Sequence, residues 1–91
     1  MKTTDKLKHA MNKLCIETLR QHQIKPINSI LAGTDTLVIS PTGSGKSAIF
    51  QCAALVMYEK TRSWTLVVEP TVSLLLDQVE KLNQLGIGAQ F

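Results

Sequence analysis

The sequence has few aromatic residues, few cysteines and no hydrophobic run long enough to cross a membrane. Aromatic residues make up only 4% of the chain, so its 44% hydrophobic content is mainly aliphatic, as expected of a parallel sheet covered by helices. Cys15 and Cys52 lie far apart and form no Cys-x-x-Cys pair. This spacing disfavours a disulfide or zinc site and favours ordinary buried thiols in a reducing compartment.

The basic N-terminal segment is not followed by an apolar core, so it does not have the pattern of a secretory signal. We therefore expect a soluble, intracellular protein of the cytoplasm, nucleoid or nucleus, with no membrane partner. A length of 91 residues predicts one small domain or a piece of a larger one. The net charge of +3 suits an anionic partner, but an ordinary solvated surface explains most charge excesses of this size.

Residues 1–35 are predicted to form an N-terminal helical segment. Apolar residues recur at helical spacing from Asp5 to about Leu19, and the stripe is Leu7, Ala10, Met11, Leu14 and Thr18. A second helix is expected from Ile27 to Leu31, with Pro26 near its start, where a missing N–H costs nothing.

Residues 36–91 show a strand and helix alternation. Continuous apolar runs at 37–39 and 64–68 are typical of strands buried on both faces. The apolar segment 48–58 between them is long enough for a crossover helix, so the strands should be parallel with a right-handed connection. A further helical stripe covers 72–82. The predicted fold class is therefore α/β, with part of a parallel sheet flanked by helices.

The loop between the first run and the next helix has the pattern of a phosphate-binding loop, although Ser40 replaces the usual first glycine. Gly43 and Gly45 permit backbone conformations that direct several N–H groups at one phosphate. In such loops Lys46 would neutralise the β- and γ-phosphates of ATP, and the Ser47 hydroxyl would bind Mg²⁺. The predicted nucleotide-binding loop residues are Thr42, Gly43, Ser44, Gly45, Lys46 and Ser47, with Lys46 also the predicted catalytic residue.

Two other interpretations of this loop remain open. It can be a glycine-rich turn between strand and helix that carries one surface lysine. It also satisfies the Gly-x-Gly-x-x-Ala pattern of dinucleotide-binding turns at 43–48, with Glu69 placed where a ribose-binding acid would lie. The spacer 40–42 argues against the second interpretation, because the dinucleotide turn follows its strand tightly.

Several segments resemble the superfamily-2 helicases, and the RecQ-type DNA helicases in particular. Residues 41–47 have the helicase form of the phosphate loop, Pro-Thr-Gly-Ser-Gly-Lys-Ser, and residues 50–55 look like the continuation Tyr-Gln-x-Pro-Ala-Leu. Residues 19–23 match a Phe-Arg-x-x-Gln element, and 68–79 resemble the segment Ser-Pro-Leu-x-Ser-Leu-x-x-Asp-Gln-Val. The resemblance covers roughly residues 14–91 and implies the N-terminal portion of a RecA-like, P-loop ATP-binding domain.

The resemblance also implies site residues and partners. Gln23 would recognise the adenine edge, with Arg20 near the base. Pro70, Thr71 and Ser73 would border single-stranded or partly duplex DNA, with RNA an alternative, although Thr71 and Ser73 can equally cap the following helix. The sequence departs from the family at Leu19, which replaces an aromatic residue, and at Cys15, which replaces a glycine.

The parts needed for hydrolysis are missing from the sequence. Triphosphate hydrolysis also requires an acid that positions Mg²⁺ and an arginine finger, and in the resembled family the acid comes from an Asp-Glu-x-His box. The chain has no Asp-Glu pair. We therefore expect nucleotide binding here, and hydrolysis and unwinding only in a longer parent that supplies the rest of the helicase core. A stand-alone nucleotide- or nucleic-acid-binding remnant and another superfamily-2 helicase, acting on RNA, are the competing hypotheses.

Overall fold

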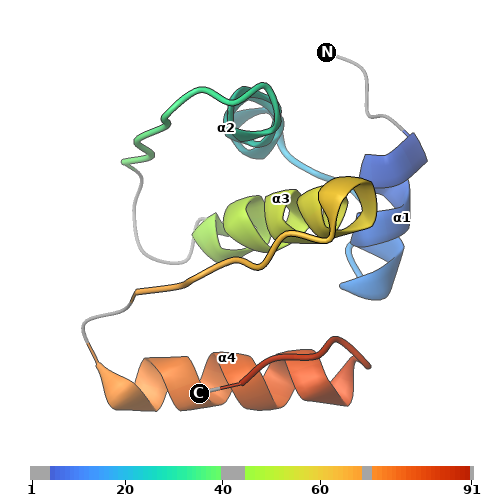
Figure 1. Ribbon diagram of the computed structural model, residues 1–91. Helices are drawn as coiled ribbons and strands as arrows, with labels where there is room; N and C mark the ends of the chain where they lie inside the picture. Colours follow the sequence, from blue (N-terminus) through green and yellow to red (C-terminus); the bar gives the residue numbers. More distant parts are fainter. Residues whose placement is uncertain (1–4, 40–44, 69–70, 91) are drawn as a thin grey trace.

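Four helices are present in the residues that the computed structural model describes, which are 5–39, 45–68 and 71–90. They are α1 (Asp5–Lys13), α2 (Gln21–Leu31), α3 (Lys46–Thr61) and α4 (Val72–Gln84). Figure 1 shows α1 and α2 against α3, while α4 lies on the other side of the extended segment that follows α3. Helix α3 is therefore the central element of the fold.

The core lies between α1, α2 and α3. It includes the predicted α1 stripe except Thr18, which is exposed. Its fully buried large side chains come one from each helix, Leu7, Ile27 and Cys52. Helix α3 is buried along one face, and its other face leaves Met57 and Tyr58 exposed. Even so, none of the described helices is long and apolar enough to cross a membrane.

The predicted parallel sheet is wrong for the described part of the chain, in which no residue belongs to a strand. The two apolar runs are extended but unpaired, and the side chains of Leu37, Ile39, Trp64, Leu66 and Val68 are 84–93% exposed. An apolar run specifies a tendency to extend and to be buried, but a strand exists only when a neighbouring segment accepts and donates its backbone hydrogen bonds. That partner is absent from the described residues, so the α/β assignment fails here.

The predicted helix boundaries in the N-terminal segment also need correction. The helical spacing up to about Leu19 leaves the end of the first helix open, and α1 ends at Lys13. Helix α2 begins at Gln21 and not near Ile27. Pro26 consequently lies inside α2, beyond the first turn, where it cannot donate a backbone hydrogen bond. Burial of Gln23 and Ile27 on either side of it holds the helix together, because tertiary packing overrides local propensity.

Three helices end in the same turn, closed by a residue with positive φ. That residue is Gly33 after α2 (φ 84°) and Gly86 after α4 (φ 81°). After α1 it is Cys15 (φ 59°). In each case the next N–H donates to a carbonyl five residues earlier, as from Ile16 to Met11 at 2.8 Å. Cys15 thus has the left-handed backbone that glycine adopts without steric cost.

We predict that Cys15→Gly stabilises the chain by about 1 kcal/mol, because glycine removes the left-handed penalty of a residue with a Cβ. Urea unfolding followed by circular dichroism measures the change. Cys15→Ala is the control: it removes the thiol but keeps the Cβ, so no gain is expected. Equal stability of the two variants would contradict the proposed strain.

The cysteines differ in environment, and both are free. Cys52 lies fully buried in the core, and burial raises its pKa to about 11. Its thiol is therefore neutral at physiological pH and serves as a small apolar side chain. The expectation of two buried thiols is confirmed for Cys52 and is wrong for Cys15, which is exposed.

Candidate nucleotide-binding site

Gly45 forms the N-terminal cap of α3 in a left-handed conformation, with φ 85° and ψ 29°. Its carbonyl accepts the N–H of Ala48 at 3.2 Å and so closes the first helical turn. Lys46 and Ser47 occupy that turn and are exposed. Both side chains thus lie at the positive end of the helix dipole, where anions bind favourably. The predicted loop residues Thr42, Gly43 and Ser44 lie outside the described residues.

Gln23 connects this loop to α2 through both ends of its amide. Its Nε2 donates to the Gly45 carbonyl at 3.0 Å, and its Oε1 accepts the backbone N–H of Arg20 at 2.8 Å. The side chain is only 7% exposed. The structure therefore brings together two predicted site residues, Gln23 and Gly45, that are 22 positions apart.

Arg20 is the N-cap residue of α2 and has an extended backbone. Its carbonyl accepts the N–H groups of Gln23 and Ile24 at 2.9 and 3.1 Å. Together with the bond from its own N–H to the Gln23 amide, this fixes the start of α2. The Arg20 side chain is exposed at this end of the helix.

Gly45 has a second structural role that the sequence pattern did not reveal. A Cβ built on it would collide with Nε2 of Gln23. The loop motif accounts for Gly45 only as a flexible residue that directs N–H groups at phosphate. The close approach of Gln23 became visible only with α2 and α3 packed together.

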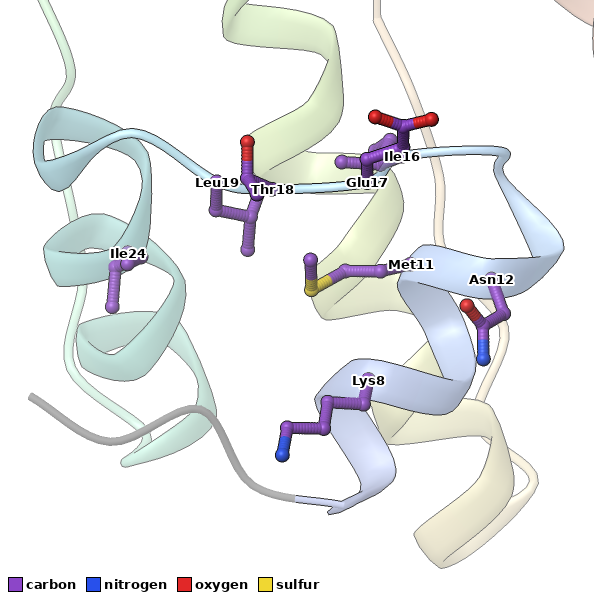
Figure 2. Close-up of a pocket in the computed structure, with 8 residues that line it drawn as sticks. All are labelled: Lys8, Met11, Asn12, Ile16, Glu17, Thr18, Leu19 and Ile24. Carbon is purple, nitrogen blue, oxygen red and sulfur yellow. The ribbon is translucent and has the colours of Figure 1, made fainter.

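A pocket of about 450 Å³ lies beside the Arg20–Gln23 element, between α1, the following connection and the start of α2. Figure 2 shows Met11, Leu19 and Ile24 around its interior, with the Lys8 amine at its rim. Arg20, Gln23 and Gly45 are absent from its described lining, which comprises Lys8, Met11, Asn12, Ile16, Glu17, Thr18, Leu19 and Ile24. Its lining residues thus adjoin the Arg20–Gln23 element in sequence but do not include Gly45.

Two of the predicted nucleic-acid residues, Thr71 and Ser73, lie at the start of α4. Thr71 is its N-cap residue, but its side chain makes no capping hydrogen bond. Thr71 and Ser73 are both exposed, and Pro70 lies outside the described residues. In Figure 1 both α3 and α4 begin on the same side of the molecule. The loop end of α3 and the start of α4 therefore face one side of the fold.

Metal-binding groups matter for this site, because the predicted site includes Mg²⁺. Within the described residues, no group of three or more His, Cys, Asp or Glu side chains is placed to hold a metal ion. The Ser47 hydroxyl is the candidate Mg²⁺ ligand that sequence reasoning identified, and it is exposed at the start of α3. These residues can bind a phosphate chain, and a hydrolytic site would need further acidic groups.

Comparison with known proteins identifies similar sequences over most of the chain. Residues 20–91 match the family described as DEAD/DEAH box helicase. The chain is 38% identical over 81 residues to the ATP-dependent DNA helicase hus2/rqh1 of Schizosaccharomyces pombe, covering 89% of this chain and 6% of that protein. It is 43% identical over 70 residues to the ATP-dependent helicase SGS1 of Saccharomyces cerevisiae, covering 77% of this chain and 5% of that protein.

The ATP-dependent DNA helicase RecQ of Haemophilus influenzae is 41% identical over 75 residues, which cover 82% of this chain. The matched region is only 12% of that relative's length. No solved structure matches the chain. The sequence therefore spans a small part of the curated helicases that it resembles.

Proposed function

Because this chain belongs to the DEAD/DEAH box helicase family, we propose that it is the ATP-binding portion of a RecQ-like ATP-dependent DNA helicase. The observation that best supports this proposal is the hydrogen bond from Gln23 to Gly45. It joins the residue proposed to recognise adenine to the residue that begins the phosphate-binding helix. A glycine-rich turn with an incidental lysine would not require that connection.

In this proposal the phosphate chain lies at the start of α3. Gly45 and the first N–H groups of the helix would donate to phosphate oxygens, as would Thr42, Gly43 and Ser44 in the preceding loop. Lys46 would neutralise the β- and γ-phosphates, and Ser47 would hold Mg²⁺. Bound Mg²⁺ would neutralise part of the negative charge of the phosphates. The exposure of Lys46 and Ser47 in the first turn of α3 is consistent with these roles.

The adenine base would be recognised by Gln23, with Arg20 beside it. A glutamine amide has two N–H donors and an oxygen with two lone pairs. The bonds described for Gln23 use one donor and one lone pair. The amide therefore retains the donor and acceptor pair that the edge of adenine requires, while its protein bonds fix its orientation.

Nucleic-acid contact and strand separation are proposed for the longer helicase. Pro70, Thr71 and Ser73 would border the single strand at the start of α4, on the side where α3 begins. The relatives named above include DNA helicases, so DNA is the proposed substrate. The chain has no Asp-Glu pair to position Mg²⁺ for hydrolysis. We assign turnover to the remainder of the helicase core and binding to this segment.

Lys46→Ala is expected to weaken Mg²⁺·ATP binding by about tenfold or more, because it removes the cation that neutralises the phosphates. Isothermal titration with ATP and Mg²⁺ measures the affinity. Lys81→Ala is the matched control, since Lys81 is an exposed lysine of α4, and it should leave affinity unchanged. Binding of NAD that is indifferent to Lys46→Ala, without ATP binding, would overturn the proposal and favour a dinucleotide site.

A further inference from the structure

Two aromatic and two basic side chains occupy every second position where α3 ends and the extended segment begins. They are Tyr58, Lys60, Arg62 and Trp64, which we call the α3-end patch. Helix α3 has 16 residues, so this patch lies about 24 Å along the helix from Gly45. It is therefore separate from the proposed nucleotide site. Figure 1 also places the start of α4 at the far end of the extended segment.

The local backbone presents these side chains to solvent. Arg62 caps α3 in a left-handed conformation, with φ 57°, and its N–H donates to the Tyr58 carbonyl at 2.8 Å. Its guanidinium lies 5.0 Å from the centre of the Tyr58 ring, a cation–π contact. Trp64 follows on extended backbone and is 93% exposed. The faces of its ring are therefore accessible for stacking on a partner.

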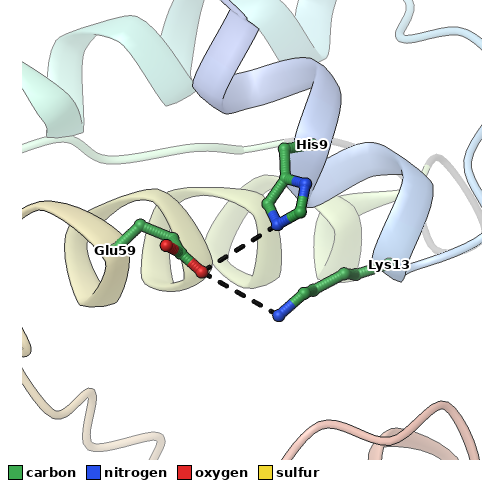
Figure 3. Close-up of polar contacts among 3 residues, drawn as sticks. All are labelled: His9, Lys13 and Glu59. Carbon is green, nitrogen blue, oxygen red and sulfur yellow. Dashed lines mark ion pairs between the residues drawn. The ribbon is translucent and has the colours of Figure 1, made fainter.

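The charges around the patch are mainly positive. Glu59 is the acidic residue within this stretch, and its carboxylate faces α1 (Figure 3). Its Oε1 lies 3.9 Å from Lys13 Nζ and 4.0 Å from His9 Nε2. The Glu59 carboxylate is therefore directed toward the α1 side chains, and the basic residues of the patch itself are Lys60 and Arg62. The surface suits a polyanion better than an apolar peptide.

We propose that the α3-end patch binds single-stranded nucleic acid. Exposed aromatic faces stack on unpaired bases, and neighbouring Lys and Arg side chains contact the phosphates. Trp64 supplies the accessible ring, and the Tyr58–Arg62 pair supplies a second planar surface with its own charge. This site goes beyond the proposed function, because it is remote from Gly45 and from the residues at the start of α4.

The test uses the intrinsic fluorescence of Trp64, the one tryptophan of the chain. Titration with an oligothymidine of about ten nucleotides, within the usual site sizes, should quench that fluorescence. Trp64→Ala should weaken binding, measured by anisotropy of the labelled oligonucleotide, by about tenfold. Lys60→Gln should reduce the slope of log affinity against log salt by about one, because one phosphate contact is lost.

Leu66→Ala is the matched control, because Leu66 is 89% exposed on the same extended segment but carries no ring, and binding should be unchanged. Mg²⁺·ATP affinity should also be unchanged in Trp64→Ala, which separates this site from the nucleotide site. Unquenched Trp64 fluorescence, or equal oligothymidine affinity in Trp64→Ala, would overturn the proposal. Binding to phosphatidylserine vesicles that oligothymidine does not displace would likewise overturn it in favour of a membrane surface.

Discussion

Ile27→Ala is expected to lower the free energy of unfolding by about 2–5 kcal/mol, the usual cost of removing a fully buried isoleucine side chain. Ile27 is 0% exposed and belongs to the core formed by α1, α2 and α3. The total free energy of unfolding of a small domain is only slightly larger than this loss. Most molecules should therefore unfold at room temperature, which far-UV circular dichroism and a urea titration would show.

Leu37→Ala is the matched control, because Leu37 is 85% exposed and its truncation should change stability by less than about 0.5 kcal/mol. Ile27 also lies one helical turn after Gln23, and both are buried on the same face of α2. Loss of Ile27 should thus also loosen the Gln23–Gly45 contact. Similar stability losses in the two variants would show that the core is not centred on Ile27.

Gly45→Ala is expected to destabilise the chain by about 2–5 kcal/mol through two separate effects. A residue with a Cβ in a left-handed conformation costs about 1–2 kcal/mol, and Gly45 has φ 85°. The Cβ would also displace Nε2 of Gln23 from the Gly45 carbonyl. Loss of that partly buried hydrogen bond adds about 1–3 kcal/mol. Urea unfolding measures the sum, and ATP affinity should fall with it.

Gly33→Ala isolates the backbone effect. Gly33 has φ 84°, but a Cβ there would meet no atom within 4 Å. The excess loss in Gly45→Ala over Gly33→Ala should therefore measure the contact with Gln23. Adding Gln23→Ala to Gly45→Ala relieves the collision, so the two substitutions should cost less together than the sum of each alone. Strict additivity would show that Gln23 and Gly45 do not interact.

The helical part of the fold was predictable where a repeating apolar stripe is buried. The spacing of Leu7, Ala10, Met11 and Leu14 predicted α1, and these side chains are all buried. Its end was not predictable from that stripe, because Leu14 is still buried after the helix has stopped. The turn at Cys15 ends it, and cysteine carries no local signal for a left-handed backbone.

The apolar runs at 37–39 and 64–68 show the limit of local pattern. Their composition predicted strands buried on both faces, yet most of their large side chains are exposed and no described residue is in a strand. The hydrophobicity of a segment indicates that it tends to be buried. Strand pairing depends in addition on which other segment lies beside it and forms the backbone hydrogen bonds. Sequence periodicity does not contain that second piece of information.

By itself, the sequence determined the family of this protein: a lysine, a serine and a glycine in the pattern of a phosphate-binding loop, and helicase motifs in the expected order. These properties depend on residue types at short spacing, which the chain specifies locally. Only the tertiary structure decided that Gln23 reaches Gly45 across 22 positions, that Pro26 lies inside a helix, and that Trp64 faces solvent. The first two depend on how α1, α2 and α3 pack, because burial and long-range hydrogen bonding are properties of the assembled core. Trp64 is exposed because it follows α3 on an extended segment outside that core.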